Sequence, residues 1–142
     1  ESLSESMKNF LKNLTAEHDF CHGFKESIAE PGGRERLKDA IKNNPPVVHP
    51  VIRTHPITKR KAIFVNPLFT TKINELSKSE SDALLEFLYS YSITPEFTCR
   101  FSWTPNSIAI WDNRCTLHKP INDYFPEHRL LERITVDGDE PF

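Results

Sequence analysis

The sequence predicts a mainly β domain with flanking helices, and three observations carry this prediction. Apolar and polar residues alternate over 97–103, as in a half-buried strand, and the apolar run "SIAIWD" at 107–112 marks a mostly buried one. The chain shows no βαβ alternation and no internal repeat. A capping box at Ser77 to Glu80 begins the clearest helix, over 78–91. This pattern is typical of an antiparallel α+β or jelly-roll sheet with helices packed outside.

The other elements follow from periodicity and from chain breakers. Apolar residues at helical spacing predict a helix over 3–16, and "EPGGR" then breaks the chain. A short polar helix carrying Leu37 and Ile41 ends at "NNPP". Strands are predicted over 47–53 and 60–66, joined by the turn "HPITK", and over 130–136. Because Pro50 cannot donate to a ladder, the first of these strands is expected to be interrupted or to lie at a sheet edge.

Composition bounds the class of protein. The 142 residues predict one domain, 1–142, and the 37% hydrophobic and 27% charged residues indicate a soluble globular chain. A net charge of -2 gives no basis for binding nucleic acid or a membrane surface, and no apolar run is long enough to span a bilayer. Cys21, Cys99 and Cys115 form no CxxC pair, which favours a reducing, cytoplasmic compartment over a zinc ribbon or a disulfide framework.

The stretch "WDNRCTLHKP", at 111–120, brings a histidine and two arginines close together in the sequence. His118 follows the predicted strand, and Arg129 and Arg133 lie 11 and 15 residues after it. Positions four apart on a strand share a face, so both guanidinium groups are able to project into one cavity. Their planar forks suit carboxylate or sulfonate oxygens. From spacing alone, an outward-facing strand paired with neighbouring acidic residues explains the two arginines equally well.

Other candidates carry less chemistry. The chain has no GxGxxG, P-loop, HExxH or GxSxG motif, which removes the commoner nucleotide, zinc-protease and serine-hydrolase functions. Phe24 and Phe69 are candidates for pocket walls, although aromatic residues belong to the core more often. "RTHP" at 53–56 is interpreted as a structural turn in which His55 bonds to the backbone. His18 and Asp19 form an acid–base pair only by adjacency, and adjacent side chains in an extended segment point apart.

Several stretches together resemble one known family. They are "NPPVVHPVIRTHPITKRKAIFVN", "FTTKI", "SIAIWDNRCTLH", "DYFPEHRLLERIT" and "GDEPF". They closely resemble the C-terminal part of the taurine dioxygenases, which are iron(II)- and 2-oxoglutarate-dependent oxygenases. The resemblance runs from about Glu17 to Phe142. It implies a double-stranded β-helix, or jelly roll, that is incomplete in this chain. It also implies the oxidation of taurine or a related sulfonate to sulfite and an aldehyde, with molecular oxygen and 2-oxoglutarate consumed.

The resemblance also implies roles for individual residues. His118 matches the family's distal histidine ligand to iron, Arg129 the arginine that binds the far carboxylate of 2-oxoglutarate, and Arg133 the arginine that holds the substrate sulfonate. Phe24 and Phe69 match aromatic residues that line the substrate pocket. A departure from the family occurs beside the first of these, where the taurine enzymes have a serine and this chain has a glycine at position 23.

The family's other two iron ligands come from an HxD motif, and none of the six histidines of this chain begins HxD or HxE. A single imidazole cannot hold iron(II) usefully. The chain is therefore expected to be the tail of a longer dioxygenase, consistent with its start at Glu1, or a truncated homologue that acts as a binding or interaction module. By itself it is expected to be inactive. A small-molecule sulfonate and oxygen are the expected partners, and homo-oligomers remain open.

Overall fold

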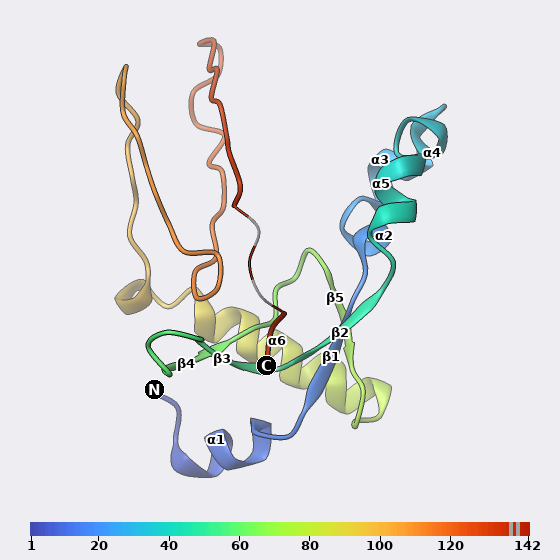
Figure 1. Ribbon diagram of the computed structural model, residues 1–142, viewed down its shortest axis with the longest axis vertical. Coiled ribbons are helices and arrows are strands. Elements are labelled where there is room, and N and C mark those ends of the chain that lie inside the picture. Colours follow the sequence, from blue (N-terminus) through green and yellow to red (C-terminus); the bar gives the residue numbers. More distant parts are fainter. Residues whose placement is uncertain (137, 139) are drawn as a thin grey trace.

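The computed structural model describes residues 1–136, 138 and 140–142 of the chain (Figure 1). A compact body holds the sheets and one long helix, while a group of short helices and two extended arms project from it. The elements, in chain order, are α1 (Glu5–Leu11), β1 (Thr15–His18), α2 (Phe20–Gly23), α3 (Lys25–Ala29), α4 (Gly33–Arg36), α5 (Lys38–Asn43), β2 (Val47–Pro50), β3 (Ile52–Thr54), β4 (Lys61–Ile63), β5 (Thr70–Ile73), α6 (Lys78–Ser92) and the 3-10 turn η1 (Pro95–Phe97).

The first sheet is antiparallel, with the strand order β2-β1-β5. Its central strand β1 was not predicted, because "TAEH" is short and its first two residues fall within the helix expected over 3–16. Ala16 pairs with His49 on one side and with Ile73 on the other, and it is fully buried. The expected helix is real but ends early, at Leu11 in α1. The chain therefore enters the sheet a full strand earlier than its periodicity suggests.

The predicted strands over 47–53 and 60–66 are confirmed in shortened form. The first is split into β2 and β3, and β2 is an edge strand, as Pro50 predicts. Between them lies Val51, fully buried, whose amide donates to the Leu14 carbonyl and whose carbonyl accepts from the Phe64 amide. β3 and β4 pair as an antiparallel hairpin, with Ile52 opposite Ile63. The "HPITK" turn thus joins two paired strands, as expected.

The predicted helix over 78–91 is confirmed as α6, and it covers the core. The Ser77 amide and hydroxyl both donate to the Glu80 carboxylate, at 2.9 and 2.6 Å, so the expected capping interaction starts the helix. Leu88 is fully buried with the residues of the sheet. Ser81 joins helix to sheet, because its buried Oγ accepts from the Ile73 amide at 2.8 Å.

The segment between β1 and β2 is helical but adds little to the core. Of the residues in α2, α3, α4 and α5, only Gly33 is buried. A Cβ at Gly33 would lie 1.9 Å from the Ser27 carbonyl oxygen, so the "PGG" break lets α4 turn tightly against α3. The polar helix predicted before "NNPP" corresponds to α5.

The strands predicted over 97–103, 107–112 and 130–136 are wrong for the described residues, which form no strand after β5. After η1 the chain runs out and back twice in the extended arms of Figure 1. Ile110 and Ile134 are 94% and 93% exposed, so the apolar pattern behind these predictions has nothing to cover it. A strand also needs a partner for its backbone amides. The described residues therefore form small antiparallel sheets mixed with helices, rather than a mainly β jelly roll.

Candidate functional site

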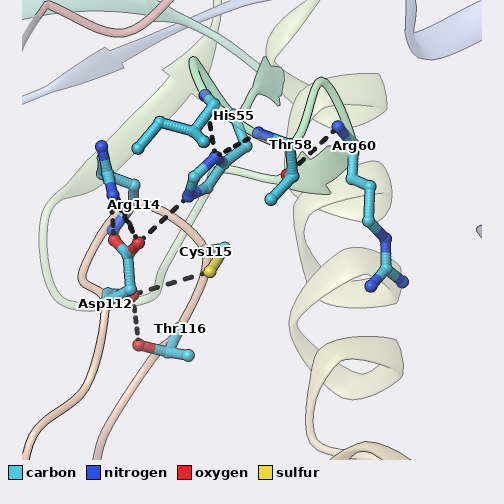
Figure 2. A network of polar contacts seen from close by, with 8 residues as sticks. His55, Thr58, Arg60, Asp112, Arg114, Cys115 and Thr116 are labelled. Carbon is cyan, nitrogen blue, oxygen red and sulfur yellow. Dashed lines mark hydrogen bonds and ion pairs between the residues drawn. The ribbon is translucent and has the colours of Figure 1, made fainter.

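A network of polar contacts joins the β3–β4 hairpin to the turn that begins the "DNRCTLH" stretch (Figure 2). His55 is buried just after β3, and its Nδ1 accepts from the amides of Ile57 and Thr58 at 3.2 and 3.1 Å. With Nδ1 accepting two bonds, the ring proton is on Nε2. Nε2 therefore donates to Asp112 Oδ2, at 3.0 Å. The sequence interpretation of His55 as a turn residue bonded to backbone is confirmed, but the contact with Asp112 was missed.

Asp112 is the centre of this network. Arg114 donates from Nε and Nη2 to the two carboxylate oxygens, at 2.9 and 2.8 Å. This guanidinium group, and after it the bond from His55, hold the pKa of the Asp112 carboxyl well below its usual range. The Asp112 carbonyl accepts from the amide and the hydroxyl of Thr116, at 3.1 and 2.6 Å. The turn over 112–116 is thus closed by its first residue.

The side chains of His55, Asp112 and Cys115 are also close enough together to be compared with a metal site, since their donor atoms lie within 4.8 Å of one another. The geometry argues against that function. Both oxygens of Asp112 already accept from Arg114, whose positive charge would repel a cation, and the His55 Nε2 proton would have to leave. The cluster is a closed hydrogen-bond network.

His118, the candidate iron ligand, lies beyond this turn and is exposed. Its ring packs on the Trp111 ring, with centroids 5.1 Å apart and planes inclined by 50°. The Trp111 indole N–H in turn donates to the Asn113 side chain at 2.9 Å. The imidazole is therefore accessible, and it is held by the residue that immediately precedes Asp112.

The two candidate anion-binding arginines lie in the segment that follows the turn over 112–116. Arg129 places its guanidinium over the Tyr124 ring, 5.3 Å from the centroid, in a cation–π contact. Arg133 is exposed. The described residues around them form no strand, so the same-face argument from a spacing of four is not tested by this arrangement.

The two candidate pocket aromatics do come together. The rings of Phe24 and Phe69 lie 6.1 Å apart, and Phe24 also stacks on Phe20 at 4.5 Å. Gly23 makes this approach possible, because a Cβ there would lie 2.7 Å from Phe69 Cε1 and 2.8 Å from the Leu68 carbonyl oxygen. Glycine at this position, where the sequence resemblance implies a serine, therefore allows the Phe69 ring to close against α2. A cleft of about 270 Å³ lies beside Gly23 and Phe24.

A second buried polar group lies on the three-stranded sheet and was not predicted as a unit. The rings of His18 and His49 are 5.3 Å apart, and both pack near Phe64, over which the Arg53 guanidinium also lies. Burial lowers the pKa of His18 to about 4, with a smaller effect from His49. Burial likewise lowers the pKa of His49, and the Glu140 carboxylate opposes that shift. His18 was set aside because its pairing with Asp19 rested on adjacency alone. Its actual neighbours are His49 from β2, Phe64 just after β4 and Thr70 from β5.

The donor set of the described residues decides whether they fit an iron site. Among residues 1–136, 138 and 140–142, the only cluster of three possible metal ligands is the closed network at His55, and it excludes His118. His118 is an imidazole of suitable chemistry, but it belongs to no group of three possible ligands among the described residues. The described residues therefore do not complete a three-ligand iron site by themselves.

Comparison with known proteins gives the family of this chain. The profile of the family described as "Taurine catabolism dioxygenase TauD, TfdA family" matches residues 1–135, so the chain belongs to this family. The resemblance in the sequence motifs is thereby confirmed.

Individual relatives agree with the family. An "Alpha-ketoglutarate-dependent sulfonate dioxygenase" of Saccharomyces cerevisiae is 35% identical over 99% of this chain and 33% of its own length. An "Alkylsulfatase" of Acinetobacter baylyi is 34% identical over 98% of this chain and 44% of its own length. The crystal structure of a taurine dioxygenase from Burkholderia xenovorans superposes with a TM-score of 0.63 at 32% identity, over 80% of this chain and 34% of that one.

The chain thus spans about a third of the length of several of the relatives it matches. The S. cerevisiae protein is by name dependent on 2-oxoglutarate (alpha-ketoglutarate), which agrees with the cosubstrate that the sequence resemblance implies. Within the described residues, none of the helices has the length and apolar character required to cross a membrane.

Proposed function

We propose that this chain is part of an iron(II)- and 2-oxoglutarate-dependent dioxygenase that oxidises taurine or a related sulfonate to sulfite and an aldehyde. One observation carries the proposal: within a chain of this family, His118 is followed by two arginines four residues apart. One imidazole donor and two sites for anions are what this chain needs to contribute to a reaction whose two organic substrates are both anions. The name of a 35% identical relative, "Alpha-ketoglutarate-dependent sulfonate dioxygenase", supports the substrate class.

In this proposal, residues 1–142 are the C-terminal part of a single jelly-roll domain, and the remaining two iron ligands come from outside this chain. The exposed apolar residues of the two arms support that arrangement. Ile108, Ile110, Ile134 and Val136 are each more than four-fifths exposed, and strands of a completed sheet would bury such side chains. Small molecules remain the proposed partners, and an oligomer of complete domains is compatible with this arrangement.

The residues of this chain then divide the work of binding. His118 contributes one ligand to iron, Arg129 binds the far carboxylate of 2-oxoglutarate, and Arg133 binds the sulfonate. Phe24 and Phe69 form an apolar wall that excludes water from the carbon bearing the sulfonate. The contribution of these residues to catalysis is to hold two anions in fixed positions beside the metal.

The experiment compares Arg129→Ala with Arg133→Ala in the complete protein that carries this chain. Truncating one partner of a closed charge pair costs about 2–5 kcal/mol, largely because the other charge is left unpaired. Arg129→Ala should therefore raise the apparent KM for 2-oxoglutarate by roughly 30-fold or more, with a smaller change for the sulfonate.

Arg133→Ala should do the reverse and should also separate succinate formation from sulfite release, because a poorly held substrate is not oxidised when 2-oxoglutarate is consumed. Arg100, an exposed arginine paired with Asp123, provides the matched control, and Arg100→Ala should change neither constant. Equal effects of the Arg129 and Arg133 substitutions on both substrates would contradict the assignment of separate roles.

A second candidate function follows from the absence of any HxD or HxE sequence in the chain. A homologue without its iron ligands would act as a binding or interaction module. The chain alone, incubated with iron(II), 2-oxoglutarate, oxygen and taurine, is expected to release neither succinate nor sulfite under either function. Turnover by the complete protein supports the dioxygenase, and its failure with iron bound and both anions present supports the binding module.

A further inference from the structure

We propose that His55 is a positioning residue for His118, acting through Asp112 and Trp111. This inference rests on the proposed function of His118 as an iron ligand. The contact between His55 and Asp112 joins two segments that are 57 residues apart in the sequence, the β3–β4 hairpin and the turn over 112–116. Figure 2 shows this contact as the one that bridges the hairpin and the turn.

The hairpin side of the contact is rigid. His55 is buried, its amide donates to the Arg60 carbonyl at 2.8 Å, and its carbonyl accepts from the Lys59 amide at 2.9 Å. Its ring is fixed as well, because Nδ1 accepts from the amides of Ile57 and Thr58. Contacts within the hairpin therefore fix both the direction of the His55 ring and the nitrogen that carries its proton, independently of Asp112.

The turn over 112–116 connects the fixed orientation of His55 to His118. Asp112 receives the His55 proton donor on Oδ2 and is held against Arg114 by charge-assisted bonds. Trp111, its neighbour in the chain, is the residue on which the His118 ring packs. A metal ligand works best when its partners fix the ring orientation, and this path supplies such a fixation to an imidazole that is otherwise exposed.

Two substitutions of His55 separate its two nitrogen functions. In His55→Asn, the side-chain oxygen reaches about as far as Nδ1 and is able to accept from the amides two and three residues on, so the hairpin turn survives while the link to Asp112 is lost. In His55→Gln, the terminal NH₂ reaches about as far as Nε2 and is able to donate to Asp112, while the acceptor for the two amides is lost. If His55 positions His118, His55→Asn should have the larger effect. If its role is confined to the hairpin turn, His55→Gln should have the larger effect.

The first measurement uses this chain alone, with no metal, and records nuclear Overhauser contacts between the ring protons of Trp111 and His118. The contacts should persist in His55→Gln and be lost in His55→Asn. The second measurement is the affinity of the complete protein for Mn(II) as a probe of the iron site, which should fall about tenfold or more in His55→Asn and by much less in His55→Gln. Asp112→Ala removes the same link from the partly exposed side and should match His55→Asn in both measurements.

Wild-type ring contacts in both His55→Asn and Asp112→Ala would overturn the proposal, and so would their loss only in His55→Gln. If His55→Asn unfolds the chain, Asp112→Ala decides the outcome by the same two readings. A different result would contradict the proposed function instead. That result is loss of the ring contacts in His55→Asn, together with an Mn(II) affinity that is unchanged both in His55→Asn and in His118→Ala. It would mean that His55 positions the His118 ring but that His118 does not bind the metal.

Discussion

The buried histidine His18 makes the stability of this fold depend on pH. It lies in β1 with 9% of its surface exposed, its Nδ1 is 3.3 Å from the Thr70 hydroxyl, and its Nε2 is buried without a hydrogen-bond partner among the described residues. Protonation would bury a positive charge beside His49, so the pKa of His18 is lowered to about 4, mainly by burial. The unfolded chain has the ordinary histidine pKa of about 6.5.

The sign and size of the effect follow from this difference. Between pH 6.5 and pH 4 the unfolded state binds a proton that the folded state does not, so the free energy of unfolding falls as the pH falls. A difference of about 2.5 pKa units corresponds to about 3 kcal/mol, most of it lost by pH 4 and about 2 kcal/mol of it by pH 5. Urea unfolding of the wild type and of His18→Gln, at a series of pH values from 7.5 to 4, measures this contribution.

His18→Gln, which cannot titrate, should show a pH profile flatter than that of the wild type by about this amount. The exposed His22 supplies the matched control, and His22→Gln should keep the wild-type profile. Parallel profiles for wild type and His18→Gln would refute the reasoning, because they would mean that His18 titrates alike in the folded and unfolded states.

Two further substitutions test the packing around the site. Gly23→Ala should force the Phe69 ring away from α2 and cost about 1–3 kcal/mol of stability, measured by chemical denaturation. Gly138→Ala is the control and should be neutral, because the space around its Cβ is open. Equal effects of the two substitutions would contradict the close packing at Gly23. Ser81→Ala leaves the buried Ile73 amide without its acceptor and should cost about 1–3 kcal/mol, and unchanged stability together with a retained α6 helix would show that this bond contributes little.

The local elements of the fold were predictable where local physics decides them. The capping box at Ser77 set the start of α6, and the turn chemistry of "HPITK" set the β3–β4 hairpin. The strand β1 was not predicted because it depends on pairing with β2 and β5, which lie far from it in the sequence. Four residues that depend on such pairing show little hydrophobic periodicity of their own. The strands expected after η1 failed for the related reason that alternating apolar residues form a strand only where another strand pairs with them.

The candidate site shows the same division. Phe24 and Phe69 were found as separate aromatic residues, and the structure brings their rings within 6.1 Å. The contact of His55 with Asp112 was missed because no spacing rule connects residues 57 positions apart. A signal was present, since His55 and Asp112 each stand at the start of a turn whose backbone amides their side chains accept from. The roles of Arg129 and Arg133 rest on the family resemblance and remain predictions.

The central claim, that His118 is a ligand to iron, is tested most directly by the iron(II) affinity of the complete protein in two histidine variants. His118→Ala removes the proposed ligand, while His128→Ala removes an exposed histidine ten residues further along the same chain. We expect His118→Ala to weaken iron(II) binding at least tenfold and to abolish 2-oxoglutarate turnover, and His128→Ala to leave both unchanged. Wild-type iron(II) affinity in His118→Ala would contradict the claim and reduce His118 to a surface histidine that packs on Trp111.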